Sequence, residues 1–134
     1  MTDFSDFYEG AIINTMRDIP IVNCAAYVAL FTGATNLEIN VPTLEVSAGN
    51  YGRQLAGLAA PSGGASSNAA NITFPTATAN WGTISHVALV DHVTNVNWGT
   101  GVNVRMWGAL NATKVVNIGD TFMINTGDLD VTVT

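Results

Sequence analysis

After Pro20 the chain consists of short runs of β-forming residues separated by turn residues, and this pattern restricts the fold more than any other feature. Apolar and β-branched residues recur at the spacing of a sandwich or barrel. Repeats of roughly 20 to 50 residues, typical of solenoids and propellers, are absent from the sequence. The pattern predicts an all-β fold over residues 21–134, an antiparallel two-sheet sandwich that is jelly-roll-like. The predicted strands are 24–31, 43–47, 51–58, 71–74, 83–91, 102–110, 114–116, 121–124 and 129–133.

The two clearest strands also predict which side chains share a face, because side chains alternate along a strand. In the run 83–91, the residues at odd positions from 83 to 89 should lie opposite those at even positions from 84 to 90. In the run 102–110, one face should carry Val102, Val104 and Met106, and the other Asn103, Arg105 and Trp107. Phe74 and Trp81 are expected in the core. The Gly- and Ser-rich segment from Pro61 to Asn68 is expected to be a flexible loop.

The first seventeen residues show helical spacing instead. Apolar residues recur three and four positions apart, which predicts a helix from about Phe4 to Arg17 with Thr2 or Asp3 as its cap. Pro20 stops the helix, so residues 1–20 are predicted to form an arm distinct from the sandwich. The apolar stripe of this helix could dock on a neighbouring protein or pack on its own sandwich, and both interpretations stay open. The stripe, which is the predicted partner interface, contains Phe4, Phe7, Tyr8, Ile12 and Met16.

Charge and cysteine content exclude several classes of function. Ten acidic and four basic residues give a net charge of -6, and the four basic residues are scattered, so nucleic-acid binding is not expected. The longest apolar run, Cys24–Phe31, is too short to span a membrane. Cys24 is the single cysteine and is interpreted as a small buried hydrophobe. Without a possible internal disulfide, the fold is compatible with assembly in a reducing cytoplasm.

Residues that could carry catalysis or hold a metal are sparse. His86 and His92 would be about 20 Å apart on an extended strand, too far to share a metal ion. Asp120, Asp128 and Asp130 could form an oxygen-rich cation site, although a solvated turn is the preferred explanation. The sequence contains no nucleophile-and-base signature and no phosphate-binding loop. We therefore expect no enzymatic activity and no cofactor.

Arg53 is the one charged residue for which the sequence suggests a specific structural role. It lies among apolar and neutral residues, so its guanidinium must find a carboxylate or carbonyl groups. Glu45 is the natural partner if the runs 43–47 and 51–58 pair as a hairpin around Ala48–Asn50. The expected result is a local structural clamp rather than a binding site.

Six segments spread across most of the chain form a distinctive series: Tyr27–Thr32, Glu45–Gln54, Ile72–His86, Trp107–Leu110, Asn117–Phe122 and Gly127–Leu129. In this order and spacing they resemble a family of small virion proteins of tailed bacteriophages, and together they are fairly specific to it. The resemblance implies a structural role in a phage particle, in the head or in the tail. The N-terminal helix and the loop Gly33–Thr43 follow the family pattern only loosely and are expected to decide the partner.

Three functions compatible with these observations remain. The leading hypothesis is a capsid cement (decoration) protein, a homotrimer on the capsid surface that binds between capsomers of the major capsid protein and stabilises the shell. This hypothesis rests on the small number of charged residues, because a surface with few charges is suited to burial in contacts with other proteins. The alternative is a tail or tail-fibre component with tail proteins as partners. A less favoured third function is a carbohydrate-binding module, in which Trp81, Trp98 and Trp107 would stack on sugars if they were exposed.

Overall fold

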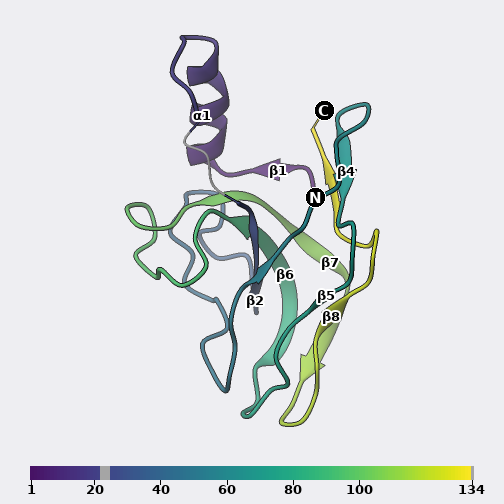
Figure 1. Cartoon of the computed structure of the whole chain (residues 1–134). Coiled ribbons are helices and arrows are strands. Elements are labelled where there is room, and N and C mark those ends of the chain that lie inside the picture. The colour runs from purple at the N-terminus through teal and green to yellow at the C-terminus, as the bar shows by residue number, and fades with distance from the viewer. Residues whose placement is uncertain (22–24, 134) are drawn as a thin grey trace.

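The computed structural model describes residues 1–21 and 25–133 and shows a mainly β protein with one short N-terminal helix (Figure 1). All strand pairs within its sheets are antiparallel, so the predicted fold class is confirmed. The Cys24 prediction lies outside the described residues. The elements are β1 (Asp3–Phe4), α1 (Asp6–Thr15), β2 (Tyr27–Phe31), β3 (Gln54–Leu55), β4 (Ala65–Ser67), β5 (Ile72–Thr73), β6 (Gly82–Val90), β7 (Val104–Val116), β8 (Met123–Ile124) and β9 (Asp130–Thr132).

A five-stranded sheet in the order β1-β7-β6-β2-β3 forms one layer of the fold. Its centre is β6, which pairs with β2 from Tyr27 opposite Val90 to Phe31 opposite His86. Two small sheets, β4-β9 and β5-β8, contribute side chains to the other layer. The N-terminal Met1 joins the layers, because its carbonyl accepts the Thr132 N–H at 3.0 Å next to β1.

The larger core lies between the five-stranded sheet and the two small sheets. Each strand of β-branched and aromatic residues turns one set of side chains toward this core, as the alternation of a strand requires. Phe74 and Trp81 are both buried there, as the sequence predicts. The buried residues of this core are Val28, Leu30, Val46, Ala56, Ile72, Phe74, Ala77, Trp81, Ile84, Val87, Leu89, Met106, Val116, Phe122, Ile124, Leu129 and Val131.

A smaller core covers the opposite face of the five-stranded sheet. Long loops close over this face, so that β2 and the second half of β6, Val87–Val90, are buried on both sides and consist of consecutive apolar residues. Asn40 fastens one loop, because its Oδ1 accepts the Val104 N–H at 2.6 Å and its Nδ2 donates to Asn103 Oδ1 at 2.9 Å. The buried residues of this core are Ala29, Phe31, Leu37, Ala88, Val90, Val102 and Val104.

Two irregularities between β6 and β7 change the predicted faces. The register shifts between Leu89 and Val90, whose partners are Met106 and Val104, so Arg105 is an extra residue. Such a bulge reverses the alternation, and Val104 and Met106 enter opposite cores. A second shift places four residues, 110–113, between the partners of Ile84 and His86. Consequently Ile84 shares the larger core with Val87 and Leu89, and the two predicted runs 102–110 and 114–116 form a single strand.

Other predicted strand boundaries are also corrected. The segment expected to be a flexible loop, 61–68, contains β4, which pairs with β9 at the far end of the chain. A tight turn at Ser62–Ala65 introduces this strand, and both of its glycines have positive φ. The runs 43–47 and 51–58 do not form a hairpin with each other. Instead, Glu45 bridges to Phe31 and β3 pairs with Tyr27 and Val28, so both runs lie along the same edge of β2.

The helix is shorter than predicted and begins later. Phe4 lies in β1, opposite Met106 of β7, and Ser5 is the cap instead of Thr2 or Asp3. Met16 is the residue that caps the C-terminal end. In Figure 1 the helix projects from one end of the sandwich. Among the described residues, α1 is far too short to cross a membrane, and no longer apolar helix is found.

Candidate functional site

The base of α1 is fixed to the sandwich by Ser5, which is completely buried. The Ser5 N–H donates to the Arg105 carbonyl at 3.0 Å, and its hydroxyl donates to the Val104 carbonyl. The same Oγ accepts the Tyr8 N–H at 3.3 Å, which caps one of the free N–H groups of the first turn. The bulge at Arg105 therefore gives the helix its attachment point. Sequence reasoning missed Ser5 because Asp3 and Thr2 are equally good capping residues.

The predicted apolar stripe does not form one surface. Phe4 and Tyr8 are partly buried against the larger core, and their ring centroids lie 5.7 Å apart. Ile12 is half-buried, whereas Phe7 and Met16 are exposed. Part of the stripe therefore packs on the sandwich of the same molecule, and the remaining part is accessible to a partner.

A second face of α1, which shares only Met16 with the stripe, is open to solvent, and we call it the outward face. Ile13 is 59% exposed and Met16 is 82% exposed, although both are large apolar side chains. Sequence reasoning missed this face because charged residues interrupt it and only the stripe showed clear apolar spacing. The outward face consists of Asp6, Glu9, Gly10, Ile13 and Met16, with Arg17 directly after them.

Arg53 and Glu45, the predicted clamp, lie together at the edge of β2. Arg53 Nε donates to Glu45 Oε1 at 2.7 Å and Nη2 donates to Oε2 at 2.8 Å, a two-pronged ion pair. Arg53 Nη1 also donates to the carbonyls of His92 and Asn95, both at 2.8 Å. The guanidinium carbon lies 4.9 Å from the ring centroid of Trp98. Arg53 thus ties the loop that follows β6 to the edge of the sheet, although the predicted hairpin is absent.

Tyr51 completes this cluster. Its hydroxyl donates to Glu45 Oε1 at 2.9 Å and accepts the Leu30 N–H at 3.0 Å. Burial raises the pKa of the Tyr51 phenol above its ordinary value of 10.0, and the Glu45 carboxylate raises it further. Burial acts to lower the pKa of Arg53, but hydrogen bonds to Glu45 and its negative charge outweigh burial, so the net shift is upward. The cluster keeps a neutral phenol beside a charged pair, which suits a structural role.

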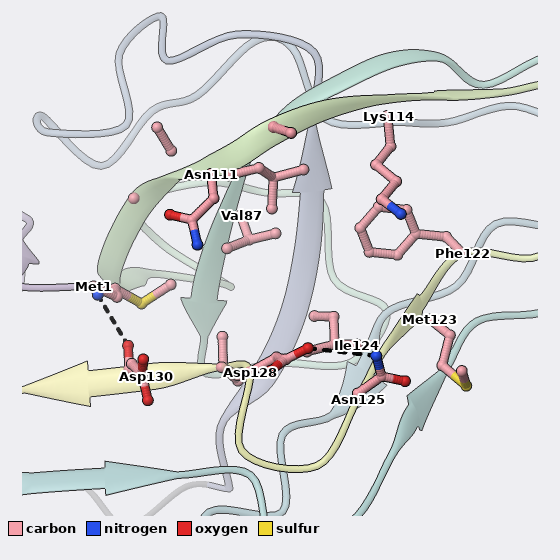
Figure 2. Close-up of a pocket in the computed structure, with 15 residues that line it drawn as sticks. Met1, Val87, Asn111, Lys114, Phe122, Met123, Ile124, Asn125, Asp128 and Asp130 are labelled. Atoms are coloured by element: carbon pink, nitrogen blue, oxygen red, sulfur yellow. Dashed lines mark hydrogen bonds between the residues drawn. The ribbon is translucent and has the colours of Figure 1, made fainter.

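An open groove of about 470 Å³ runs between the second half of β7 and the segments that carry β8 and β9 (Figure 2). Lys114 lines it on the β7 side, and Asp128 and Asp130 line it on the other side. The Met1 ammonium donates to the Asp130 carbonyl at 2.9 Å at one end. The groove is lined by both polar and apolar side chains and contains no histidine or cysteine in the described part of the chain.

The residues considered for metal binding do not gather. Asp120 closes its own turn, because its Oδ2 accepts the Asn117 N–H at 2.9 Å, while Asp128 accepts from Asn125 at 3.4 Å. His92 Nδ1 accepts two backbone N–H groups of its loop, from Thr94 and Asn95. Within residues 1–21 and 25–133, no three His, Cys, Asp or Glu side chains are placed to hold one metal ion.

The three tryptophans do not form a common stacking surface. Trp81 is buried and its Nε1 donates to the Gly49 carbonyl at 2.9 Å, so the exposure that sugar stacking requires is absent. Trp98 is covered by Arg53, and Trp107 Nε1 donates to Glu38 Oε2 at 3.0 Å. Trp81 therefore lies in the core, as the sequence predicts, and does not meet the condition of exposure that sugar stacking requires. The other two tryptophans already contact protein groups.

Comparison with known proteins identifies the family. No curated protein matches the sequence. A family model described as podophage GP4 fiber I protein gp80 matches residues 3–132, nearly the whole chain and both the sandwich and α1. This match confirms the predicted resemblance to virion proteins of tailed phages. The chain belongs to the podophage GP4 fiber I protein gp80 family, a family of tailed-phage virion structural proteins.

Proposed function

We propose that this protein is a non-enzymatic structural subunit of a podophage tail fibre. The family match over residues 3–132 carries the proposal, because the family is described by a fiber protein. The match favours the fibre alternative over the capsid cement role that led the sequence analysis. The partners in this proposal are other virion proteins of the tail.

The arrangement of the chain supports such a role. The sandwich has two internal cores and a buried Arg53–Glu45 pair that fastens its loops, which gives a rigid unit. Residues 1–20, the predicted arm, carry the exposed apolar side chains of α1. A rigid unit with one projecting apolar element is suited to attachment, since exposed apolar patches on a folded protein mark contact surfaces.

The location of the protein in the particle tests the proposal. Purified virions are labelled with a gold-conjugated antibody raised against the full chain, with antibody pre-absorbed on the purified protein as the control. The proposal predicts gold at the tail and its fibres. Gold distributed over the capsid would contradict it and support the cement role, and protein found only in the lysate would contradict both.

Particles that lack the protein provide a second, independent readout. For a fibre subunit, we expect such particles to keep filled heads with unchanged heat resistance and to lose fibre density in electron micrographs. A cement protein gives the opposite pattern, because a protein that binds only the assembled shell stabilises it. Intact fibres together with capsids that burst at a lower temperature would overturn the proposal.

A further inference from the structure

The outer edge of β7 has a partner strand over part of its length. β1 pairs with this edge at Met106 and Trp107. From Gly108 to Val116, within the residues that the structure describes, β7 pairs with a strand on its β6 side only. An unpaired strand edge presents backbone N–H and C=O groups to which another strand can bind. The open groove of about 470 Å³ lies along this part of β7 (Figure 2).

The opposite wall of the groove presents a second strand edge. β8 pairs with β5 at Met123 and Ile124, and the preceding Phe122 carbonyl accepts the Phe74 N–H at 2.9 Å. Because hydrogen-bonding groups alternate along an antiparallel strand, the N–H and C=O of Met123 point away from β5. Met123 also lines the groove. One strand placed between β7 and β8 therefore meets backbone groups on both walls.

The first residues of the chain show the direction of such a strand. The Met1 carbonyl accepts the Thr132 N–H at 3.0 Å, and the Met1 nitrogen donates to the Asp130 carbonyl at 2.9 Å. These two bonds align Met1 parallel to β9, while β1 runs antiparallel to β7. The groove continues this line beyond Met1, along β7 (Figure 2). A strand in the groove thus extends the closure of the two layers that Met1 begins.

The lining of the groove indicates which strand fits. Since side chains alternate along a strand, every second side chain of an added strand points toward the apolar floor of the groove. At the rim, Lys114 lies toward one end and Asp128 and Asp130 lie toward the Met1 end (Figure 2). Opposite charges favour an acidic residue near Lys114 and a basic residue near Asp130. The buried apolar residues of the floor are Val87, Phe122, Ile124 and Leu129.

From these observations we infer that the groove binds an extended segment of another protein, which adds as a strand antiparallel to β7. The segment alternates apolar and polar residues, with an acidic residue toward its N-terminal end and a basic residue toward its C-terminal end. Main-chain hydrogen bonds supply the affinity of such strand addition, and the alternate side chains supply its specificity. The inference goes beyond the proposed fibre role, because the groove can bind this segment wherever the protein lies in the particle.

Binding of a synthetic peptide to the full chain, measured by titration calorimetry, tests this inference. The probe is a peptide of about eight residues, blocked at both ends, in which valine and threonine alternate between an N-terminal Asp and a C-terminal Lys. We expect saturable binding of this probe. The same peptide N-methylated at alternate residues loses main-chain donors and should bind at least about tenfold more weakly. A peptide with its Asp and Lys exchanged should also bind more weakly.

Substitutions in β7 test the place of binding. Ala112→Trp fills the groove and should weaken binding of the probe at least about tenfold. Thr113→Trp, at the next exposed residue but outside the lining, is the matched control and should leave binding unchanged. Lys114→Glu should weaken binding of the probe and favour a peptide with Lys at both ends. Circular dichroism verifies that each variant keeps the fold.

Three results would overturn the inference. The first is a probe that does not bind even at millimolar concentration, and the second is binding that is indifferent to N-methylation or to Ala112→Trp. The third is displacement of the probe at high protein concentration together with a larger sedimenting mass, because a second copy of the chain would then occupy the groove. These results are separate from the gold labelling, which tests the fibre role alone.

Discussion

In the sandwich, β2 buries four of its five residues, whereas α1 has ten residues and buries none. The strand is covered on both sides by side chains of its own chain, and the polar groups around it are paired. The helix is held at its base by Ser5 and presents Ile13 and Met16 to solvent. The difference indicates that the sandwich is stabilised by its own two cores, while α1 is held mainly at its base and leaves its outward face exposed.

Truncation of a central core side chain should have the largest effect on stability. Phe74 is 1% exposed and contacts the ring of Phe122 edge-on at 5.6 Å between centroids. Phe74→Ala should lower the free energy of unfolding by about 4 kcal/mol, because it leaves a cavity. Met16→Ala, the matched truncation on α1, should change it by less than about 0.5 kcal/mol in dilute protein. Equal losses in urea denaturation would remove the contrast between the two regions.

Breaking the buried ion pair should have the next largest effect. Arg53→Ala leaves the Glu45 carboxylate and two loop carbonyls without their donor, at a cost of about 3 kcal/mol. Arg53→Lys keeps the charge but loses the two-pronged geometry, so an intermediate loss is expected. Arg17→Ala, the exposed control on the arm, should have little effect on urea denaturation of the dilute protein. A loss for Arg53→Ala no greater than that for Arg17→Ala would show that the cluster does not stabilise the sandwich.

Alkaline pH should destabilise the sandwich through Tyr51. Its phenol has a raised pKa when folded, so its contribution is complete below the unfolded pKa of about 10 and is lost as pH rises above that value. Above pH 10 the wild type should lose up to about 1.4 kcal/mol per pH unit more than Tyr51→Phe does. The free energies of unfolding of the two proteins are measured by denaturation from pH 8 to about 11. An equal loss in both proteins would contradict the raised pKa of Tyr51.

Removal of the helix cap should have a smaller effect than the substitutions at Phe74 and Arg53, and the effect should be local. Ser5→Ala removes one acceptor for the first turn and one donor to the Val104 carbonyl, at a cost of about 1 to 2 kcal/mol. We expect faster amide exchange in the first turn of α1, with the central strands unchanged. Thr2→Ala, at one of the two residues that the sequence suggested as a cap, is the control and should be neutral. Equal effects of the two substitutions would contradict Ser5 as the cap.

The sequence was sufficient to predict the features that depend on local pattern and composition. The antiparallel β class, the N-terminal helix and the burial of Phe74 and Trp81 follow from periodicity and aromatic content. The Arg53–Glu45 contact was suggested by the scarcity of charge, since a lone guanidinium in apolar surroundings needs a carboxylate. These features are short-range or depend on only two residues.

Features that depend on distant partners could not be predicted. The sequence of β4 resembles that of a linker. It forms a strand because it pairs with Val131 and its neighbours at the other end of the chain. The extra residue at Arg105 has no signature in the local sequence. It nevertheless puts Val104 and Met106 on opposite faces of the sheet, whereas regular alternation would put them on the same face. Asn68 resembles a loop residue but is buried, where its amide accepts the Leu129 N–H and donates to the Asn125 carbonyl.

Amide hydrogen exchange of the full chain tests most directly whether the sandwich is stabilised by its own cores while the helix is held mainly at its base. We expect slow exchange in β2, β6 and the paired part of β7, because their opening requires disruption of the cores. Exchange in α1 should be much faster, because its opening leaves both cores intact. Protection of α1 equal to that of the central strands would contradict this account.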